Sequence, residues 1–174
     1  MTADFGNKSS KIEKYKAFWN RDKVERPLVG FTFRGFLPME EYTVTQNWEP
    51  DTLLTPDMIN PEEFLEDEAE LLTEGEIVDD DIIRGDSPLA AVVPWLSGML
   101  GSEMKILPGN VLGKEQELSW EEALNVELDK SNPWFQKYIE FAEVLADFAD
   151  GRFPVTQGAF RGPSDLIGLL RGTT

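Results

Sequence analysis

The sequence predicts an α/β fold in which parallel strands alternate with helices. Helical and strand patterns follow one another in the order helix, strand, helix, strand, helices, strand, helix. Such alternation is typical of parallel sheets covered by helices, or of barrels surrounded by them. The 174 residues, of which 41% are hydrophobic, suffice for one domain with a core. Three strands do not close a barrel, so two strand edges would stay open.

Capping signals mark the starts of the predicted helices. A short polar side chain or a proline stands at each start, where free backbone N–H groups need acceptors. The helix with the clearest apolar spacing begins at Asn132-Pro133, and Gly151 ends it. The expected helix starts are Ser9 or Ser10, Asn60-Pro61, Ser119, Asn132-Pro133 and Asp165.

Short runs of β-branched and aromatic residues predict three strands. The first is Leu28–Phe33, the second is Ile82-Ile83, and the third is Phe153–Gln157. A loop and a helical pattern follow each run. Strands joined through helices are parallel, so we expect a parallel sheet.

The net charge excludes several classes of partner. The chain has 33 acidic and 16 basic residues, a net charge of −17. Phosphate recognition needs clustered Lys and Arg, so we expect neither nucleic acid nor an anionic membrane as a partner. No apolar stretch approaches 18 residues, and the N-terminus lacks the apolar core of a signal peptide. We therefore expect a cytoplasmic protein.

The charges are unevenly distributed along the chain. Seven of the 16 basic residues lie between Lys8 and Arg26. We interpret this segment as a solvated helix face, with a docking surface as the alternative. Residues 62–81 carry 11 acidic side chains and no basic one. We interpret Asp79–Asp81 as a solvated acidic loop rather than a cation site, because the spacing fits no calcium-binding loop.

The chain contains neither histidine nor cysteine. This composition excludes disulfides, thiolate nucleophiles, imidazole bases and the commonest zinc ligands. Any catalysis by this chain alone would have to use carboxylates, Lys, Arg, Tyr, Ser or Thr.

Three segments together carry a resemblance to a known family. They are Arg26–Pro38 (RPLVGFTFRGFLP), Asp81–Gly101 (containing DIIRGDSP and PWLSGMLG) and Phe153–Gly172 (FPVTQGAFRGPSDLIGLLRG). Their order and spacing resemble those of the uroporphyrinogen decarboxylase superfamily, which also includes corrinoid-dependent methyltransferases. The segments in register span nearly the whole chain, which argues against a chance match.

The resemblance implies the N-terminal portion of a (β/α)8 TIM barrel, because complete barrels need about 250 residues. If the resemblance holds, residues 1–174 form one incomplete domain. It has a helical segment in 1–26 and three strand and helix units in 27–174. The intact protein would be a tetrapyrrole decarboxylase or a corrinoid-dependent methyltransferase, a homo-oligomer whose partner is a tetrapyrrole or a corrinoid protein. Corrinoid or zinc would belong to the intact protein. This chain alone would hold no cofactor or metal and would be inactive.

Asp86 is the catalytic candidate that the resemblance implies. It follows Ile82-Ile83 at the distance of the family's catalytic aspartate. In a decarboxylase this carboxylate would bind the pyrrole N–H groups and favour a positively charged intermediate. The alternative is an aspartate that begins a turn before Ser87-Pro88.

Four further residues are the substrate-binding candidates: Arg34, Arg161, Gly162 and Ser164. Arg34 follows the first predicted strand, where the family binds substrate carboxylates, a task that suits a guanidinium group. Arg161 would meet an anionic substituent. Gly162 and Ser164 belong to a loop that could approach a flat macrocycle closely, or they form an ordinary helix cap.

The chain departs from the decarboxylase pattern at two positions. Decarboxylases carry a second arginine in the loop of Arg34, and a tyrosine where this chain has Gly168 or Leu169. A divergent member that acts on corrinoid-bound methyl groups or another substrate is therefore at least as plausible. The alternative function is a non-catalytic half-barrel that self-associates or binds a partner to cover its open edges.

Overall fold

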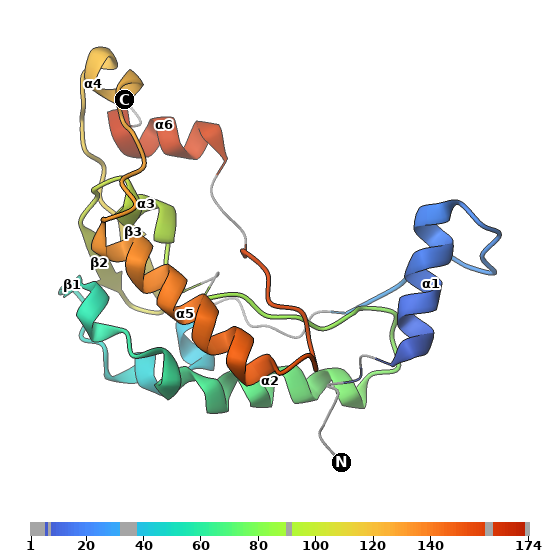
Figure 1. Cartoon of the computed structure of the whole chain (residues 1–174). Helices are drawn as coiled ribbons and strands as arrows, with labels where there is room; N and C mark the ends of the chain where they lie inside the picture. Colours follow the sequence, from blue (N-terminus) through green and yellow to red (C-terminus); the bar gives the residue numbers. More distant parts are fainter. Residues whose placement is uncertain (1–5, 7, 32–37, 90–91, 159–161, 173–174) are drawn as a thin grey trace.

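Helices and short 3-10 turns make up most of the regular structure in the computed structural model (Figure 1). The structure describes residues 6, 8–31, 38–89, 92–158 and 162–172. The α-helices are α1 (Ser9–Asn20), α2 (Leu65–Ile77), α3 (Trp95–Met99), α4 (Trp120–Leu124), α5 (Pro133–Ala149) and α6 (Pro163–Arg171). The 3-10 turns and strands are η1 (Pro38–Glu41), η2 (Val44–Asn47), β1 (Leu53–Leu54), η3 (Pro56–Met58), η4 (Pro61–Phe64), β2 (Met104–Leu107) and β3 (Asn110–Gly113).

The longest helix, α5, begins and ends where the sequence predicts. The side chain of Asn132 accepts a hydrogen bond from the backbone N–H of Trp134 (2.8 Å), and Pro133 occupies the first turn. Asp150 and Gly151 then adopt the left-handed conformation, with φ of 44° and 73°, and the helix stops. The starts of α1, α4 and α6 also lie close to their predicted positions.

Aromatic side chains form the centre of the main core. Phe64 of η4 and Phe141 of α5 are fully buried, with ring centroids 5.6 Å apart. At the other end of α5, Trp134 packs edge-on against Trp95 of α3. We call residues 38–77 and 92–149, which supply all the buried residues of this cluster except Leu89, the body. Burial of this aromatic surface is the main source of stability in the body.

The sheet of the described chain is antiparallel and has three short strands in the order β1-β2-β3. Pro108 and Gly109 join β2 directly to β3, and Gly109 has the positive φ of 75° that this tight turn requires. The side chains of Met104, Ile106 and Val111 face the core. This alternation of buried and exposed positions sets the register of the hairpin.

The predicted fold class, the N-terminal portion of a (β/α)8 TIM barrel with parallel strands, is therefore wrong. The strands lie at Leu53–Leu54, Met104–Leu107 and Asn110–Gly113, at none of which we predicted a strand, and each pairs antiparallel. The physical reason is the two-residue turn at Pro108–Gly109, because strands joined by so short a loop must run in opposite directions.

The three segments predicted as strands form no ladder of backbone hydrogen bonds in their described residues, and none of them is part of the sheet. The nearest feature is one isolated parallel bridge between described residues, which joins Asp86, three residues after the second run, to Val155 of the third. The backbone N–H groups of Val29 and Phe31 donate to aspartate side chains instead of to backbone carbonyls. Pro154 has no N–H to donate. Residues 32 and 33 of the first predicted strand lie outside the described residues.

Helix α1 stands apart from the other helices (Figure 1). We call residues 8–28, which comprise α1 and the segment after it, the arm. The arm joins the rest of the described chain at residues 80–82. In the part of the chain that the structure describes, no helix combines the length and apolar character that a membrane span requires.

Candidate functional site

The second segment of the family resemblance is hydrogen-bonded to each of the other two. The backbone N–H of Asp81 donates to the carbonyl of Val29 (2.8 Å), which connects the second segment to the first. The backbone N–H of Asp86 donates to the carbonyl of Pro154 (3.0 Å), which connects the second segment to the third. Residues 81–86 are therefore the common neighbour of two segments that are distant in the sequence.

Asp86 lies at the bridge to the third segment and is 3% exposed. Its backbone carbonyl accepts a hydrogen bond from the N–H of Thr156 (2.8 Å). Its carboxylate atom Oδ1 accepts from the N–H of Ser87 (2.7 Å), an arrangement common where aspartate begins a turn. These bonds hold the carboxylate in one orientation. They agree with the turn interpretation, and the catalytic role stays a prediction.

Two glycines allow the segments to approach closely. A Cβ atom on Gly85 would lie 2.7 Å from the backbone oxygen of Pro154, closer than real Cβ atoms come. A Cβ atom on Gly30 would lie 1.9 Å from Cγ1 of Ile82. Both glycines belong to the segments that carry the family resemblance, and the close approach gives a physical reason for them.

Asp80 is a buried carboxylate at the junction of the arm with the second segment. Its Oδ1 accepts from Nζ of Lys11 (3.3 Å), and its Oδ2 accepts from Nη2 of Arg84 (2.7 Å). The same Oδ2 accepts from the backbone N–H of Phe31 (3.0 Å). Nζ of Lys11 also donates to the carbonyl of Ile82 (2.9 Å). The charges of this buried cluster are thus compensated by opposite charges and hydrogen bonds.

Asp81 is also buried and binds the other parts of the arm. Its carboxylate accepts from Nζ of Lys14 (2.7 Å) and from the guanidinium of Arg26. It also accepts from the backbone N–H of Val29 (2.9 Å). One carboxylate therefore connects α1, the end of the arm and the first segment.

These contacts favour the ionised form of both aspartates. Hydrogen bonds from Arg26 and Lys14 hold the pKa of Asp81 well below its usual range. Burial alone would raise the pKa of Asp80. The hydrogen bonds from the Phe31 N–H, Arg84 and Lys11 outweigh this effect of burial, so the pKa of Asp80 is lowered.

The interpretation of Asp79–Asp81 as a solvated loop is correct for Asp79, which is exposed, and wrong for the other two. Burial of Asp80 and Asp81 was hard to predict, because Lys11 lies 69 residues before Asp80 and Arg26 lies 55 residues before Asp81. Within the described residues, no group of three or more acidic side chains is arranged to hold a metal ion.

The substrate-binding candidates do not gather around Asp86 in the described structure. Arg34 and Arg161 lie outside the described residues. The N–H of Gly162 donates to Oδ2 of Asp165 (3.2 Å) at the start of α6, and Ser164 is exposed in the first turn of that helix. α6 packs near α4, and no hydrogen bond between described residues connects Gly162 or Ser164 to Asp86. Their substrate-binding roles stay predictions.

Comparisons of the chain with protein-family models, with curated proteins and with solved structures each found no match. The resemblance to the uroporphyrinogen decarboxylase superfamily therefore rests on the three segments alone and stays a prediction.

Proposed function

We propose that this chain supplies a carboxylate-centred part of a binding site for a tetrapyrrole macrocycle, either a porphyrinogen or a corrinoid. The observation that supports this proposal most directly is the position of Asp86. It is a buried carboxylate at the point where two of the three family-like segments meet.

The chemistry of a buried carboxylate suits this ligand class. Pyrrole N–H groups are hydrogen-bond donors, and a fixed carboxylate can accept from them without first giving up much water. The negative charge would also stabilise positive charge that develops on a protonated pyrrole ring, because charges interact more strongly in a buried site than in water. The bond from Ser87 holds Asp86 in one orientation for this role.

The peripheral groups of the ligand would be recognised by arginine. Arg34 and Arg161 belong to the first and third family-like segments, and a guanidinium group binds carboxylates through two parallel hydrogen bonds. A carboxylated ligand needs such partners, because the net charge of −17 otherwise repels it. The missing second arginine and the missing tyrosine make a corrinoid at least as suitable a ligand as a porphyrinogen.

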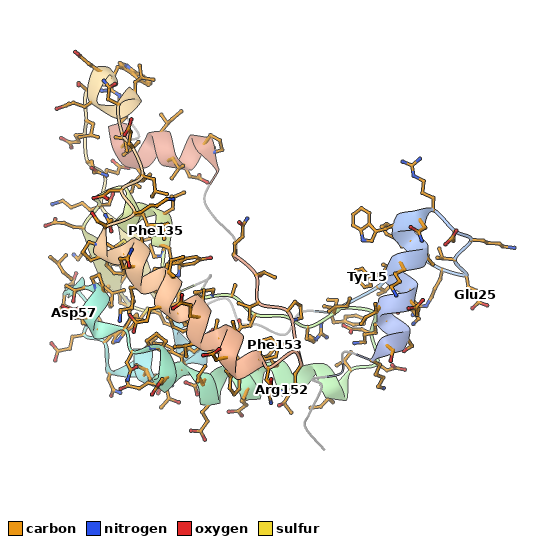
Figure 2. All side chains as sticks on the ribbon, in the orientation of Figure 1. Tyr15, Glu25, Asp57, Phe135, Arg152 and Phe153 are labelled. Atoms are coloured by element: carbon orange, nitrogen blue, oxygen red, sulfur yellow. The ribbon has the colours of Figure 1, made fainter. Side chains whose placement is uncertain are left out.

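Visible absorbance titration with uroporphyrin and with hydroxocobalamin tests the proposal. We expect a spectral shift with one of the two, and an affinity at least about tenfold weaker for Asp86→Asn. Asp57→Asn is the matched control, because Asp57 is an exposed aspartate of η3, outside the three family-like segments and far from Phe153 of the third one (Figure 2). A shift with uroporphyrin alone would indicate a decarboxylase-type substrate, and one with hydroxocobalamin alone would indicate corrinoid chemistry.

Two outcomes would overturn the proposal. One is the absence of any shift with either macrocycle up to about 100 µM, a concentration that reveals even weak binding. The other is equal affinity of the native chain and Asp86→Asn. Circular dichroism of both variants would establish that each is folded.

A further inference from the structure

An apolar surface extends across α4 and α6. Trp120 and Leu124 of α4 are 59% and 81% exposed and lie one turn apart, on the same side of the helix. Ile167 of α6 is 50% exposed, and Arg171 lies one turn after it. The guanidinium of Arg171 stacks over the ring of Trp120, 4.4 Å from the ring centroid, and so joins the two pairs. We call the surface formed by these four side chains the stripe.

Hydrogen bonds hold the two helices of the stripe together. The backbone N–H of Leu118 donates to the carbonyl of Leu170 (2.7 Å), and the guanidinium of Arg171 donates to the carbonyl of Leu118. The hydroxyl of Ser119 accepts from the N–H of Glu122 (3.2 Å) and caps α4. An apolar surface that is fixed in this way loses little conformational freedom when it binds a partner.

Acidic side chains flank the stripe. Residues 115–129, which comprise α4 and its neighbours in the sequence, contain six acidic residues and no basic one. All six are exposed. Asp165, in the first turn of α6, is exposed as well. The positive charge of Arg171 offsets only one of these seven negative charges, so the stripe is an apolar surface within strongly acidic surroundings.

A polar cleft adjoins the stripe. It has a volume of about 440 Å³, and Leu118, which is hydrogen-bonded to the stripe, is one of the residues that line it. Three glutamates and one lysine give the cleft a net charge of −2. Lys114 pairs with Glu103 (3.0 Å), so the excess negative charge lies on Glu115 and Glu117. A cleft of this charge suits the ammonium or guanidinium group of a single side chain.

We propose that the stripe and its cleft bind a basic amphipathic helix of another protein. The apolar face of that helix would cover the stripe, its lysines and arginines would face the flanking carboxylates, and one of them would enter the cleft. Charge complementarity favours this occupant, because both the surface and the whole chain, with its net charge of −17, are acidic. The same charge disfavours nucleic acids and anionic lipid surfaces. This inference is independent of ligand binding at Asp86.

A fluorescently labelled model peptide tests the inference first. The probe has about 18 residues, with leucine at every third or fourth position and lysine elsewhere, so that its leucines share one helical face. Fluorescence anisotropy at about 0.15 M salt should give a dissociation constant of about 10 µM or lower. A peptide of the same composition, with its leucines spread around the helix, should bind at least about tenfold more weakly. No binding up to about 100 µM, or equal binding of the two peptides, would overturn the proposal.

A pair of matched tryptophan variants tests the apolar part of the surface. Trp120→Ser should weaken binding of the amphipathic peptide about tenfold or more, as expected for a central aromatic anchor. Trp19→Ser is the control, because Trp19 is 76% exposed on α1, on the other side of the molecule from α4 (Figure 1). Equal affinities of the two variants, with both folded by circular dichroism, would overturn the proposal.

Charge reversal separates the acidic surroundings of the stripe from the overall charge of the chain. Glu117→Lys with Glu121→Lys changes the net charge by the same amount as Glu66→Lys with Glu70→Lys. Glu66 and Glu70 are exposed on α2, away from α4 and α6 (Figure 1). The first double variant should weaken peptide binding about thirtyfold or more, and the second less than about threefold. Equal weakening would show that only net charge matters and would overturn the proposal.

The molar mass of the chain tests whether a second copy occupies the stripe instead. Light scattering of the native chain and of Trp120→Ser, at the same concentration, should give the same mass, because the proposed partner is a different protein. A lower mass for Trp120→Ser would show that a second copy covers the stripe, and it would overturn the proposal.

Discussion

The body and the arm are held in place by different forces. In the body, Phe64, Trp95 and Phe141 are buried among other apolar side chains. The arm is attached through two buried aspartates and the cations around them, and it adds nothing to the apolar clusters of the described residues. Apolar packing tolerates changes of pH and salt, whereas ion pairs do not. The two regions should therefore respond separately to perturbation.

The largest effect should come from the body. Phe141→Ala removes a fully buried ring that packs on Phe64, and should lower the free energy of unfolding by about 3–5 kcal/mol. Urea denaturation followed by circular dichroism measures this loss. Ile139→Ala, a partly exposed position on the same helix, is the control and should cost about 1 kcal/mol or less. Equal losses of unfolding free energy at the two positions would mean that the aromatic cluster is not the main source of stability in the body.

A smaller and more local effect should follow Lys11→Ala. Loss of this buried cation leaves Asp80 and the Ile82 carbonyl without one hydrogen-bond donor each, at a cost of about 2–3 kcal/mol. Hydrogen exchange should speed up in α1 and remain slow in α5. Lys16→Ala, which breaks only an exposed ion pair, should leave both helices unchanged. Faster exchange throughout α5 would show that arm and body unfold together.

Acid should release the arm before it unfolds the body. Folding lowers the pKa of Asp80 and of Asp81, so their stabilisation is complete above the unfolded value of about 3.9. It is lost as the pH falls below that value through the folded pKa values. Hydrogen exchange in α1 should therefore rise between about pH 4 and pH 2 before circular dichroism of α5 changes. If exchange in α1 and the circular dichroism of α5 changed at the same pH, the arm and the body would not respond separately to acid.

Local signals in the sequence placed the starts of α4, α5 and α6 within two residues, whereas α3 (Trp95–Met99) was not predicted and Asn60 makes no side-chain cap hydrogen bond. Asn132-Pro133 and Gly151 specify both ends of α5 within a few residues, and Ser119 forms the expected capping box with Glu122. The hairpin also had a local signal, because Pro108-Gly109 separates two alternating runs. Our prediction nevertheless placed no strand there.

The errors arose where long-range contacts compete with local preference. The run around Val29 favours a strand, but aspartate side chains 49 and 52 residues away accept its N–H groups. An acidic run is usually solvated, and only Lys11, Lys14 and Arg26 make burial of Asp80 and Asp81 possible. No spacing rule connects these residues. For the same reason, Asp86 could be selected by its place in a motif, whereas its neighbours Pro154 and Thr156 could not.

The bond between Lys11 and Asp80 also sets an order of events during synthesis. The ribosome adds the aspartate 69 residues after the lysine, a delay of about 3–14 s at about 5–20 residues per second. During that time the nascent helix has no acceptor for its lysines, and its tryptophan and phenylalanine are already outside or leaving the exit tunnel. The arm is thus made well before the residues that hold it in place.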